Sequence, residues 1–472
     1  MIDLLDGTLW RSDGDDNHWP PVPSQQGAAL LAMLQQLDRS QWFPSELLAQ
    51  LQRAQLTKVL QFAYAHVPFY RDRYSGFGRS FLRRVDGADF RQLPLVRRAD
   101  VQQRQDALTA SPVPAAHLPL AEVHTSGSTG MPIKAQTTAR TRLFWNALTL
   151  RDHVWHRRDL RGKLAAIRHA AKDVAAFPAG TTFDSWGPPV SLVFRSGPSA
   201  LLNIRTDVAR QLEWLRAQQP DYVITYPSNA RELGRLMGDQ ARALPQLREL
   251  RLFGEVVDDE TRAECARAWG VPVTDGYSAN EVGYIALQCP ERAHYHVQSE
   301  SLLVEVLRED AEPCTPGETG RVVITTLHNF AMPLIRYDIG DYAEVGPPCP
   351  CGRGLPVLRR ILGRGRNMLR LPTGEVRWPV PGAGGFRERA PVRQYQVVQK
   401  TLNEIEFRLV VERALTSEEE SSLREKLLES LGYPFEVAIS YHLQLERSPS
   451  LKFEEFKSLV EPTQGSARKG QE

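Results

Sequence analysis

The sequence of 472 residues is poor in cysteine and lysine, has no long apolar run, and carries no marked excess of charge. It lacks an apolar stretch of about 18 residues, so we expect neither a transmembrane helix nor a membrane partner. Its 58 basic and 56 acidic residues give a formal net charge of +2, which disfavours a nucleic-acid binder. Its five cysteines indicate a reducing, cytoplasmic compartment rather than a disulfide framework. The acidic N-terminus has none of the features of a secretory signal peptide.

Short apolar runs alternate with helical segments from about residue 120 to residue 290. The strand signals cover 221–228, 247–255 and 271–277, and the helical segments between them cover 230–244 and 259–270. This order predicts an α/β fold with a largely parallel sheet, in which chemistry is placed at the carboxyl ends of the strands. Residues 302–345 carry short strand signals separated by Pro/Gly turns, which indicates a smaller antiparallel unit.

Two further regions have clear helix boundaries. The segment 44–74 has apolar positions at helical spacing, and its helix is expected to end at or just before Pro68. Near the C-terminus, strand signals at 395–400, 405–412 and 435–444 surround a helix at 416–432 whose Thr416 and Glu419 have capping-box spacing. This pattern predicts a small α+β domain, followed by a disordered tail from about residue 460.

The segment TSGSTGMP, residues 125–132, is the most distinctive local motif. Its glycines and hydroxyl residues suit close approach to a polyanion, but no Gly-Lys-Ser/Thr follows at P-loop spacing. The segment resembles the phosphate-binding loop of adenylate-forming enzymes. From about residue 44 to residue 458 the chain resembles the phenylacetate–CoA ligase family, whose motifs appear in order as YPSNARELGRLM, FGEVVDDETRAECARAWGVPVTDGYSANEVG, GETGRVVITTLHNFAMPLIRYDIGD, CPCGRGLPVLRRILGR and RSPSLKF.

The resemblance implies a two-domain enzyme. Residues 1–362 would form a large adenylate-forming domain, with mixed parallel sheets, helices and a small β unit. Residues 363–472 would form a small, mobile α+β domain that carries the catalytic lysine. The acyl pocket would be lined from 140–200, 221–230, 252–256 and 276–284.

The resemblance also implies an ATP site. Tyr277 would pack on adenine, Glu281 would be catalytic and bind Mg²⁺, and Asp341 would accept the ribose hydroxyls. Two residues depart from the family motif: Ser278 replaces a glycine, and Asn280, which would contact the α-phosphate, replaces a hydroxyl residue. The other ATP-binding residues implied by the match are Thr125, Ser126, Gly127, Ser128, Thr129, Gly130, Gly254, Glu255 and Arg364. For Gly254 and Glu255, a simple strand-end turn is nearly as well supported.

Lys452 is the predicted catalytic lysine that bridges the attacking carboxylate and the adenylate. Only nine of the 58 basic residues are lysines, so a lysine at a motif position is informative. Two positions depart from the family pattern: Leu451 replaces a glycine, and Arg366-Asn367 replaces an acidic pair at the hinge. These departures keep open a second class of function, a non-catalytic homologue that acts as a binding protein.

Three of the five cysteines suggest a metal site. Cys289, Cys349 and Cys351 with His296 would make a closed, structural zinc site, and His294 is the alternate ligand. Some members of the family carry such a site. Reduced cysteines without metal are the plain alternative. A zinc ribbon that binds nucleic acid is disfavoured by the balanced charge and the absence of interleaved aromatic residues.

These observations predict an AMP-forming acid–thiol ligase. ATP would activate a small carboxylic acid, aromatic or hydrophobic, to acyl-AMP, and coenzyme A would accept the acyl group. Within the same class, the acceptor is alternatively a carrier-protein thiol or an amine. The expected cofactors are ATP, Mg²⁺ and structural Zn²⁺, and the expected state is a monomer or homodimer.

Overall fold

The computed structural model describes residues 10–12, 19–77, 87–124, 133–238, 244–378, 385–445 and 453–460. The predicted α/β fold is confirmed. The chain divides into two compact units, and among the described residues the first runs to Ile361 and the second begins at Leu362. Among the described helices, none is long and apolar enough to cross a membrane.

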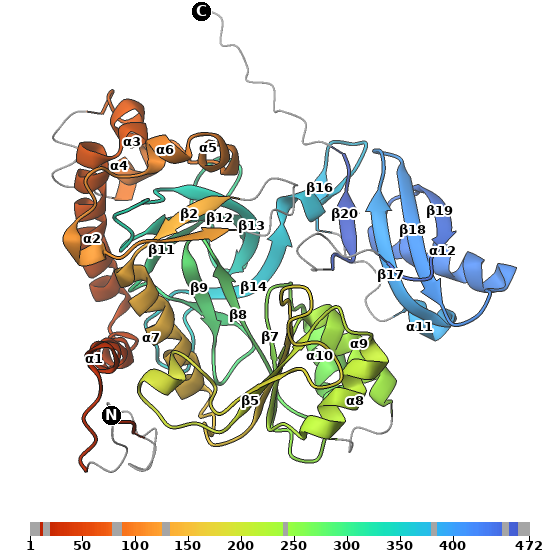
Figure 1. The fold of residues 1–472 in the computed structure, drawn as a ribbon. Helices are drawn as coiled ribbons and strands as arrows, with labels where there is room; N and C mark the ends of the chain where they lie inside the picture. Colours follow the sequence, from red (N-terminus) through yellow and green to blue (C-terminus); the bar gives the residue numbers. More distant parts are fainter. Residues whose placement is uncertain are drawn as a thin grey trace, which may run out of the picture. The chain divides into compact units, whose positions relative to one another are not determined.

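A twelve-stranded sheet forms the framework of the first unit (Figure 1). Its strands are β3 (Leu164–Arg168), β4 (Thr181–Phe183), β5 (Ser199–Asn203), β6 (Tyr222–Thr225), β7 (Glu249–Leu252), β8 (Val273–Ala279), β9 (Gly283–Gln288), β10 (Tyr295–Val297), β11 (Leu302–Leu307), β12 (Thr319–Thr326), β13 (Tyr337–Val345) and β14 (Val357–Arg364). The spatial order is β11-β12-β13-β14-β10-β9-β8-β7-β6-β3-β5-β4. A separate ribbon pairs β1 (Ala121–His124) with β2 (Lys134–Thr137).

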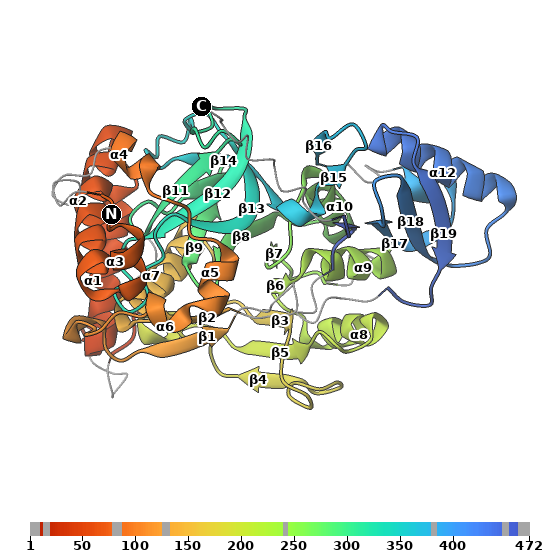
Figure 2. The ribbon, with the colours of Figure 1, turned by 90° about the horizontal axis from the view of Figure 1, so that it is seen from above.

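The half of the sheet from β5 to β8 is parallel, as predicted. The strands and helices expected between residues 221 and 277 are β6, α9 (Pro227–Met237), β7, α10 (Asp259–Trp269) and β8. The helix α8 (Val208–Gln218) packs beside α9, and α9 packs beside α10 (Figure 2). Apolar residues of the three helices and of β3, β5, β6 and β7 share one core. Helices cover parallel strands of this kind, so the side chains of the strands that face the helices are apolar.

The strands between residues 302 and 345 are antiparallel, as predicted, but they do not form a separate unit. They continue the large sheet through β14, β10 and β9 to β8. The junction is β8, whose residues 273–275 pair in parallel with β7 and whose residues 276–279 pair antiparallel with β9. A seven-residue strand is long enough to serve both partners, so the two halves become one sheet.

The first unit contains seven α-helices besides α8, α9 and α10 in its described residues. They are α1 (Gln25–Ser40), α2 (Ser45–His66), α3 (Pro68–Arg73), α4 (Gly87–Gln92), α5 (Arg98–Gln103), α6 (Gln105–Leu108) and α7 (Ala139–Trp155). The predicted helix end before Pro68 is confirmed, and Pro68 then begins α3 at a position where its missing N–H costs nothing.

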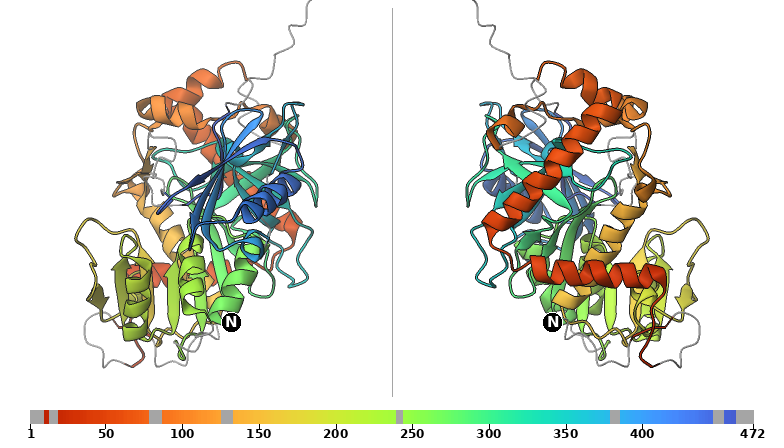
Figure 3. Two further views of the ribbon diagram at one scale, coloured as in Figure 1. Left: turned by 90° about the vertical axis from the view of Figure 1, so that its right-hand side faces the viewer. Right: turned by 90° about the vertical axis from the view of Figure 1, so that its left-hand side faces the viewer.

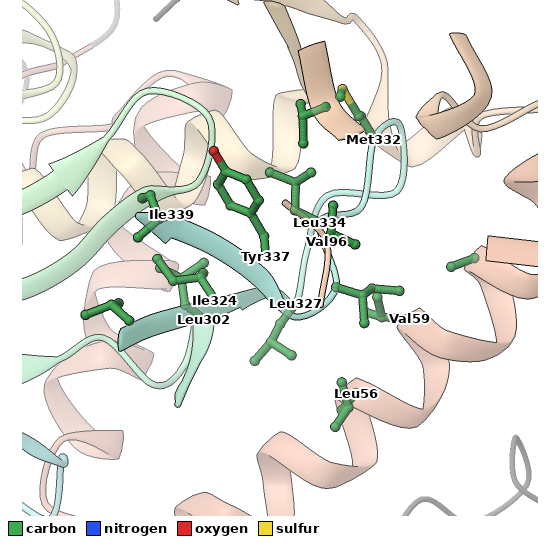
Figure 4. Close-up of a cluster of buried hydrophobic side chains, with 14 of the residues drawn as sticks. Leu56, Val59, Val96, Leu302, Ile324, Leu327, Met332, Leu334, Tyr337 and Ile339 are labelled. Carbon is green, nitrogen blue, oxygen red and sulfur yellow. The ribbon is translucent and has the colours of Figure 1, made fainter. Parts of the chain in front are cut away.

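The longest of these helices form part of two hydrophobic cores. Leu56 and Val59 of α2 pack with Leu302, Ile324 and residues of β13 (Figure 4). Apolar side chains of α1 share a second core with Phe144 and its neighbours on α7. Figure 3 shows α1 and α2 together on one side of this unit. Both helices come from the part of the chain that precedes the sheet.

The second unit is a four-stranded sheet in the order β19-β18-β17-β20 with one long helix. Its elements are β15 (Leu369–Arg370), β16 (Val376–Arg377), α11 (Phe386–Arg389), β17 (Val392–Gln399), β18 (Glu404–Val411), α12 (Ser417–Leu431), β19 (Glu436–Tyr441) and β20 (Phe456–Ser458). The predicted capping box of α12 is confirmed, since Thr416 and Glu419 each accept the other's backbone N–H. The tail expected to be disordered falls on 461–472, outside the described residues.

Candidate active site and Cys/His cluster

Several predicted site residues lie at or near the carboxyl ends of neighbouring strands. Gly254 and Glu255 follow β7, Asn280 and Glu281 follow β8, and Tyr277 lies within β8. This is the edge of a parallel sheet at which binding sites form. The strand order therefore brings together groups that two separate motifs supply.

Tyr277 and Asp341 are in direct contact. The Tyr277 hydroxyl donates a hydrogen bond of 2.7 Å to Oδ2 of Asp341, which lies on β13 and is buried. A carboxylate accepts up to four hydrogen bonds, a property that suits the predicted role of Asp341 with the ribose hydroxyls.

Glu281 is buried next to the start of the predicted phosphate loop. Its side chain is 4 % exposed, and the Tyr337 hydroxyl lies 3.4 Å from its Oε1. The neighbouring Asn280 donates from Nδ2 to the carbonyl oxygen of His124 at 3.1 Å. Since His124 ends β1, the chain enters the predicted loop beside Asn280 and Glu281. The predicted loop residues Thr125, Ser126, Gly127, Ser128, Thr129 and Gly130 lie outside the described residues.

Glu255 has a structural role that the motif did not indicate. It accepts hydrogen bonds from the backbone N–H and the hydroxyl of Ser228 at 2.9 and 3.1 Å. Ser228 lies in the first turn of α9, where a carboxylate satisfies unpaired N–H groups and suits the helix dipole. Gly254 has φ +80°, a left-handed backbone that favours glycine. The turn after β7 is therefore held to the start of α9 by hydrogen bonds.

The last two predicted site residues, Arg364 and Lys452, lie at and after the predicted hinge. Arg364 is the last residue of β14, and Gly365–Asn367 form a short 3-10 helix after it. Lys452 lies outside the described residues, as does the rest of the segment 446–452.

A cavity of about 240 Å³ adjoins Asn280 and Glu281. Phe144, Trp145 and Leu148 of α7 line it together with residues 280–284, as the predicted acyl pocket requires. The described residues of its lining do not include the predicted segments 221–230 and 252–256. They include instead Ser301, Leu302, Thr326, His328 and Asn329, which the motifs did not single out.

The missed residues of this lining share a position at strand ends. Ser301 directly precedes β11, and His328 and Asn329 follow β12 at a distance of two and three residues. Polar residues next to apolar strands could therefore have marked these positions as candidate site residues in the sequence. The sequence does not show, however, that these strand ends face α7.

The four predicted zinc ligands come together. The ligand atoms of Cys289, His296, Cys349 and Cys351 all lie within 4.8 Å of one another. Cys289 Sγ and Cys349 Sγ are 3.9 Å apart, and Cys351 Sγ is 3.4 Å from His296 Nε2. Tetrahedral zinc with bonds of about 2.3 Å to sulfur and about 2.0 Å to nitrogen separates such pairs by about 3.8 and 3.5 Å. The spacing therefore fits the ion.

The surroundings of the cluster match its donors. The backbone N–H of Cys351 points to Cys349 Sγ at 3.4 Å, and His296 Nδ1 lies 3.5 Å from the carbonyl oxygen of Leu355, which leaves Nε2 for the cluster. His294, the alternate ligand, is outside the group, with its ring centroid 5.5 Å from that of His296. Burial raises the pKa of Cys349 to about 12 and lowers the pKa of His296 to about 4. A bound cation would reverse the effect on the thiol.

A second group of ionisable residues lies at the amino ends of β7 and β8. Arg158 donates two hydrogen bonds of 2.8 Å to the two oxygens of Glu249 and one of 2.6 Å to Asp152. Arg251 also donates to Asp152, at 2.8 Å. All four residues are largely buried, and none of them belongs to the sequence motifs described above.

The chain is similar in sequence to curated phenylacetate-coenzyme A ligases. It is 27 % identical to the Thermus thermophilus protein over 345 residues, 69 % of this chain and 72 % of that protein. It is 27 % identical to the Escherichia coli protein over 332 residues, 68 % of this chain and 71 % of that protein. The predicted resemblance to phenylacetate–CoA ligases is confirmed. No family model matches the chain.

The fold is that of adenylate-forming CoA ligases. The structure of 2-hydroxyisobutyryl-CoA ligase in the postadenylation state, in complex with 2-HIB-AMP, aligns with a TM-score of 0.69. The alignment covers 95 % of both chains at 19 % identity. These similarities to phenylacetate–CoA ligases in sequence and to CoA ligases in fold agree with the predicted enzyme class, an AMP-forming acid–thiol ligase.

Proposed function

We propose that this protein activates a carboxylic acid with ATP to an acyl-adenylate and then transfers the acyl group to a thiol, with coenzyme A as the acceptor. The observation that carries the proposal is the arrangement of the predicted ATP-site residues near Glu281. Tyr277 donates to Asp341, Asn280 donates to the carbonyl oxygen of His124, which precedes the glycine-rich loop, and a cavity adjoins Asn280 and Glu281.

The charges of these residues suit the reaction. ATP is a polyanion with a ribose whose hydroxyls are donors, so Asp341 is the proposed ribose acceptor and loop 125–130 the proposed phosphate site. Glu281 would hold Mg²⁺, which supplies neutralisation of phosphate charge when bound; a buried carboxylate is a suitable hard oxygen donor. Lys452 would place a cation beside the reacting carboxylate.

The cavity supports the acid-binding part of the proposal. Its volume of about 240 Å³ is below the range of about 300–1,000 Å³ typical of sites for drug-sized ligands. The pocket therefore suits a small acid rather than a long acyl chain.

Screening pyrophosphate release over a panel of small carboxylic acids, with and without coenzyme A, tests the function. We expect acid-dependent release and, with coenzyme A, a thioester product. Lys452→Ala should reduce acid activation far more than thioester formation from preformed acyl-adenylate. Lys457→Ala, on β20, is the matched control and should leave both steps near the wild-type rate. Silence over the whole panel would favour a non-catalytic binding protein. Transfer to an amine or a carrier protein in place of coenzyme A would correct the acceptor.

We propose also that Cys289, His296, Cys349 and Cys351 hold a structural zinc ion, on the strength of the donor spacing given above. Elemental analysis should find about one zinc per chain. Cys351→Ser should lower the metal content and the thermal midpoint. Cys314→Ser, a cysteine outside the group, should change neither. Metal-free protein of unchanged stability would contradict the site.

A further inference from the structure

Several aromatic side chains line the cavity beside Glu281. Phe144 stacks on His328 with ring centroids 4.2 Å apart and planes 17° apart, and Trp145 lies against Tyr284 at 4.7 Å. All four residues line the cavity. Ring faces of this kind pack best against another ring. The shape and size together favour an acid with one aromatic or heteroaromatic ring.

Most polar groups of the lining are already used within the protein. The Asn329 amide donates to the carbonyl of Gln136, and its Oδ1 accepts from two backbone N–H groups. The Thr326 hydroxyl exchanges hydrogen bonds with the backbone of Leu334. The Thr141 hydroxyl is taken up by the cap of α7. These groups are not available to distinguish one acid from another.

His328 is different. Its Nε2 lies 2.9 Å from the carbonyl oxygen of Glu300, and since a carbonyl only accepts, Nε2 must carry the proton. Nδ1 is then a lone-pair acceptor, provided the ring is neutral. Burial lowers the pKa of His328 to about 4, so the ring is neutral at physiological pH.

The acceptor Nδ1 belongs to a residue that lines the cavity. Among the residues that the structure describes, it has no hydrogen-bond partner. A ligand that fills the cavity with an apolar group would leave Nδ1 unpaired, whereas a donor would satisfy it.

We propose that His328 selects acids whose single ring carries a hydrogen-bond donor: a ring N–H, a hydroxyl or an amino group. This inference rests on the proposed function and narrows its substrate class. His328 acts as a specificity residue of the acid pocket and takes no part in proton transfer.

Two other lining residues are the alternatives to be separated by experiment. The Ser301 hydroxyl both donates and accepts, so it does not by itself favour donors over acceptors. Arg142 donates from Nη2 to the carbonyl of Pro119, and its buried Nη1 has no partner among the described residues. If Arg142 sets the choice, acids with a second negative charge would be preferred.

The test compares acids of matched shape in the pyrophosphate-release assay. The pairs are pyrrole-2-carboxylate against furan-2-carboxylate, each hydroxybenzoate against the corresponding methoxybenzoate, and each aminobenzoate against the corresponding toluate, with the benzenedicarboxylates as the arm for Arg142. We expect kcat/KM to be at least about tenfold higher for the donor of the best pair, the effect of one hydrogen bond that its competitor leaves unmade.

Three variants locate the effect. His328→Phe keeps the ring on Phe144 but removes the acceptor, so the donor preference should collapse while the KM for ATP is unchanged. His117→Phe, a neighbouring buried histidine outside the described lining, should retain the preference, and Ser301→Ala should retain most of it. Equal use of donors and non-donors, a preference that survives His328→Phe, or best activity with dicarboxylates would each overturn the inference. Absence of pyrophosphate release with every acid would instead contradict the proposed function.

Discussion

The two ends of β7 and β8 both carry ionisable residues, but they use them differently. At the amino ends, Arg158 and Arg251 face Glu249 and Asp152, so two cations meet two anions and every charge has a partner. At the carboxyl end of β8, Glu281 is buried beside the Tyr337 hydroxyl, and Asp341 on β13 is buried beside the Tyr277 hydroxyl. Their neighbour Asn280 is exposed beside a cavity.

The comparison shows how to tell a structural network from a binding site. Buried charges without a partner are costly, so an evolved interior pairs them completely unless a ligand is to complete the set. The Arg158 network is complete in itself and ties α7 to two strands. The carboxylates of Glu281 and Asp341 instead contact tyrosine hydroxyls, and in the proposed function they bind the metal and the ribose of ATP.

Breaking the amino-end network should give the largest effect. Arg158→Met leaves Glu249 buried without its main partner, so unfolding should become easier by about 3–5 kcal/mol. Urea unfolding followed by fluorescence measures the loss. Arg161→Met, which removes an exposed pair with Asp159, should change stability by less than about 1 kcal/mol. Unchanged stability of Arg158→Met would show that the network is not a structural element.

Glu281→Gln should have the opposite profile. If Glu281 holds Mg²⁺ as proposed, loss of its charge is expected to slow pyrophosphate release by about 10²–10³-fold, with a higher requirement for Mg²⁺. The urea midpoint should stay near that of the wild type. Glu291→Gln, an exposed glutamate, is the control for both measurements. A strongly destabilised Glu281→Gln with normal activity would reverse the assignment of the two ends.

A pH series sharpens the contrast further. Burial, with Arg251 and Arg158 nearby, holds the pKa of His153 well below its usual value, so the ring is neutral when folded and protonates on unfolding. Stability from this group is therefore full above about pH 6.5 and falls as the pH drops. Between pH 7.5 and 5.5, His153→Gln should lose about 1.4 kcal/mol less than the wild type. Equal losses would mean that His153 is not held neutral.

Tyr277→Phe should give the smallest effect. It removes the hydrogen bond to Asp341 and leaves the ring, so the KM for ATP should rise about fivefold with little change in kcat. Titration of ATP in the pyrophosphate-release assay measures the change. A fall in kcat with constant KM would place Tyr277 in the chemical step rather than in nucleotide binding.

Much of the fold was predictable because its signals are local. The alternation of strands and helices between residues 221 and 277, the helix end before Pro68 and the cap at Thr416 each depend on a few neighbouring residues. The residues around Tyr277, Glu281 and Asp341 were found through short motifs. Their contacts were not, because a motif names residues without giving the distance between them.

The sequence by itself determined the class of the fold, the resemblance to phenylacetate–CoA ligases and the four residues of the Cys/His cluster. Only the tertiary structure showed that β8 joins a parallel and an antiparallel half into one sheet. The reason is that the pairing of a strand depends on which strands lie next to it in the folded chain. The tertiary structure also brought together residues far apart in the chain, such as Arg158 with Glu249 and Phe144 with His328. Such packing also decides which side chains are buried and whether a histidine such as His328 is neutral. A local stretch of sequence does not determine either property.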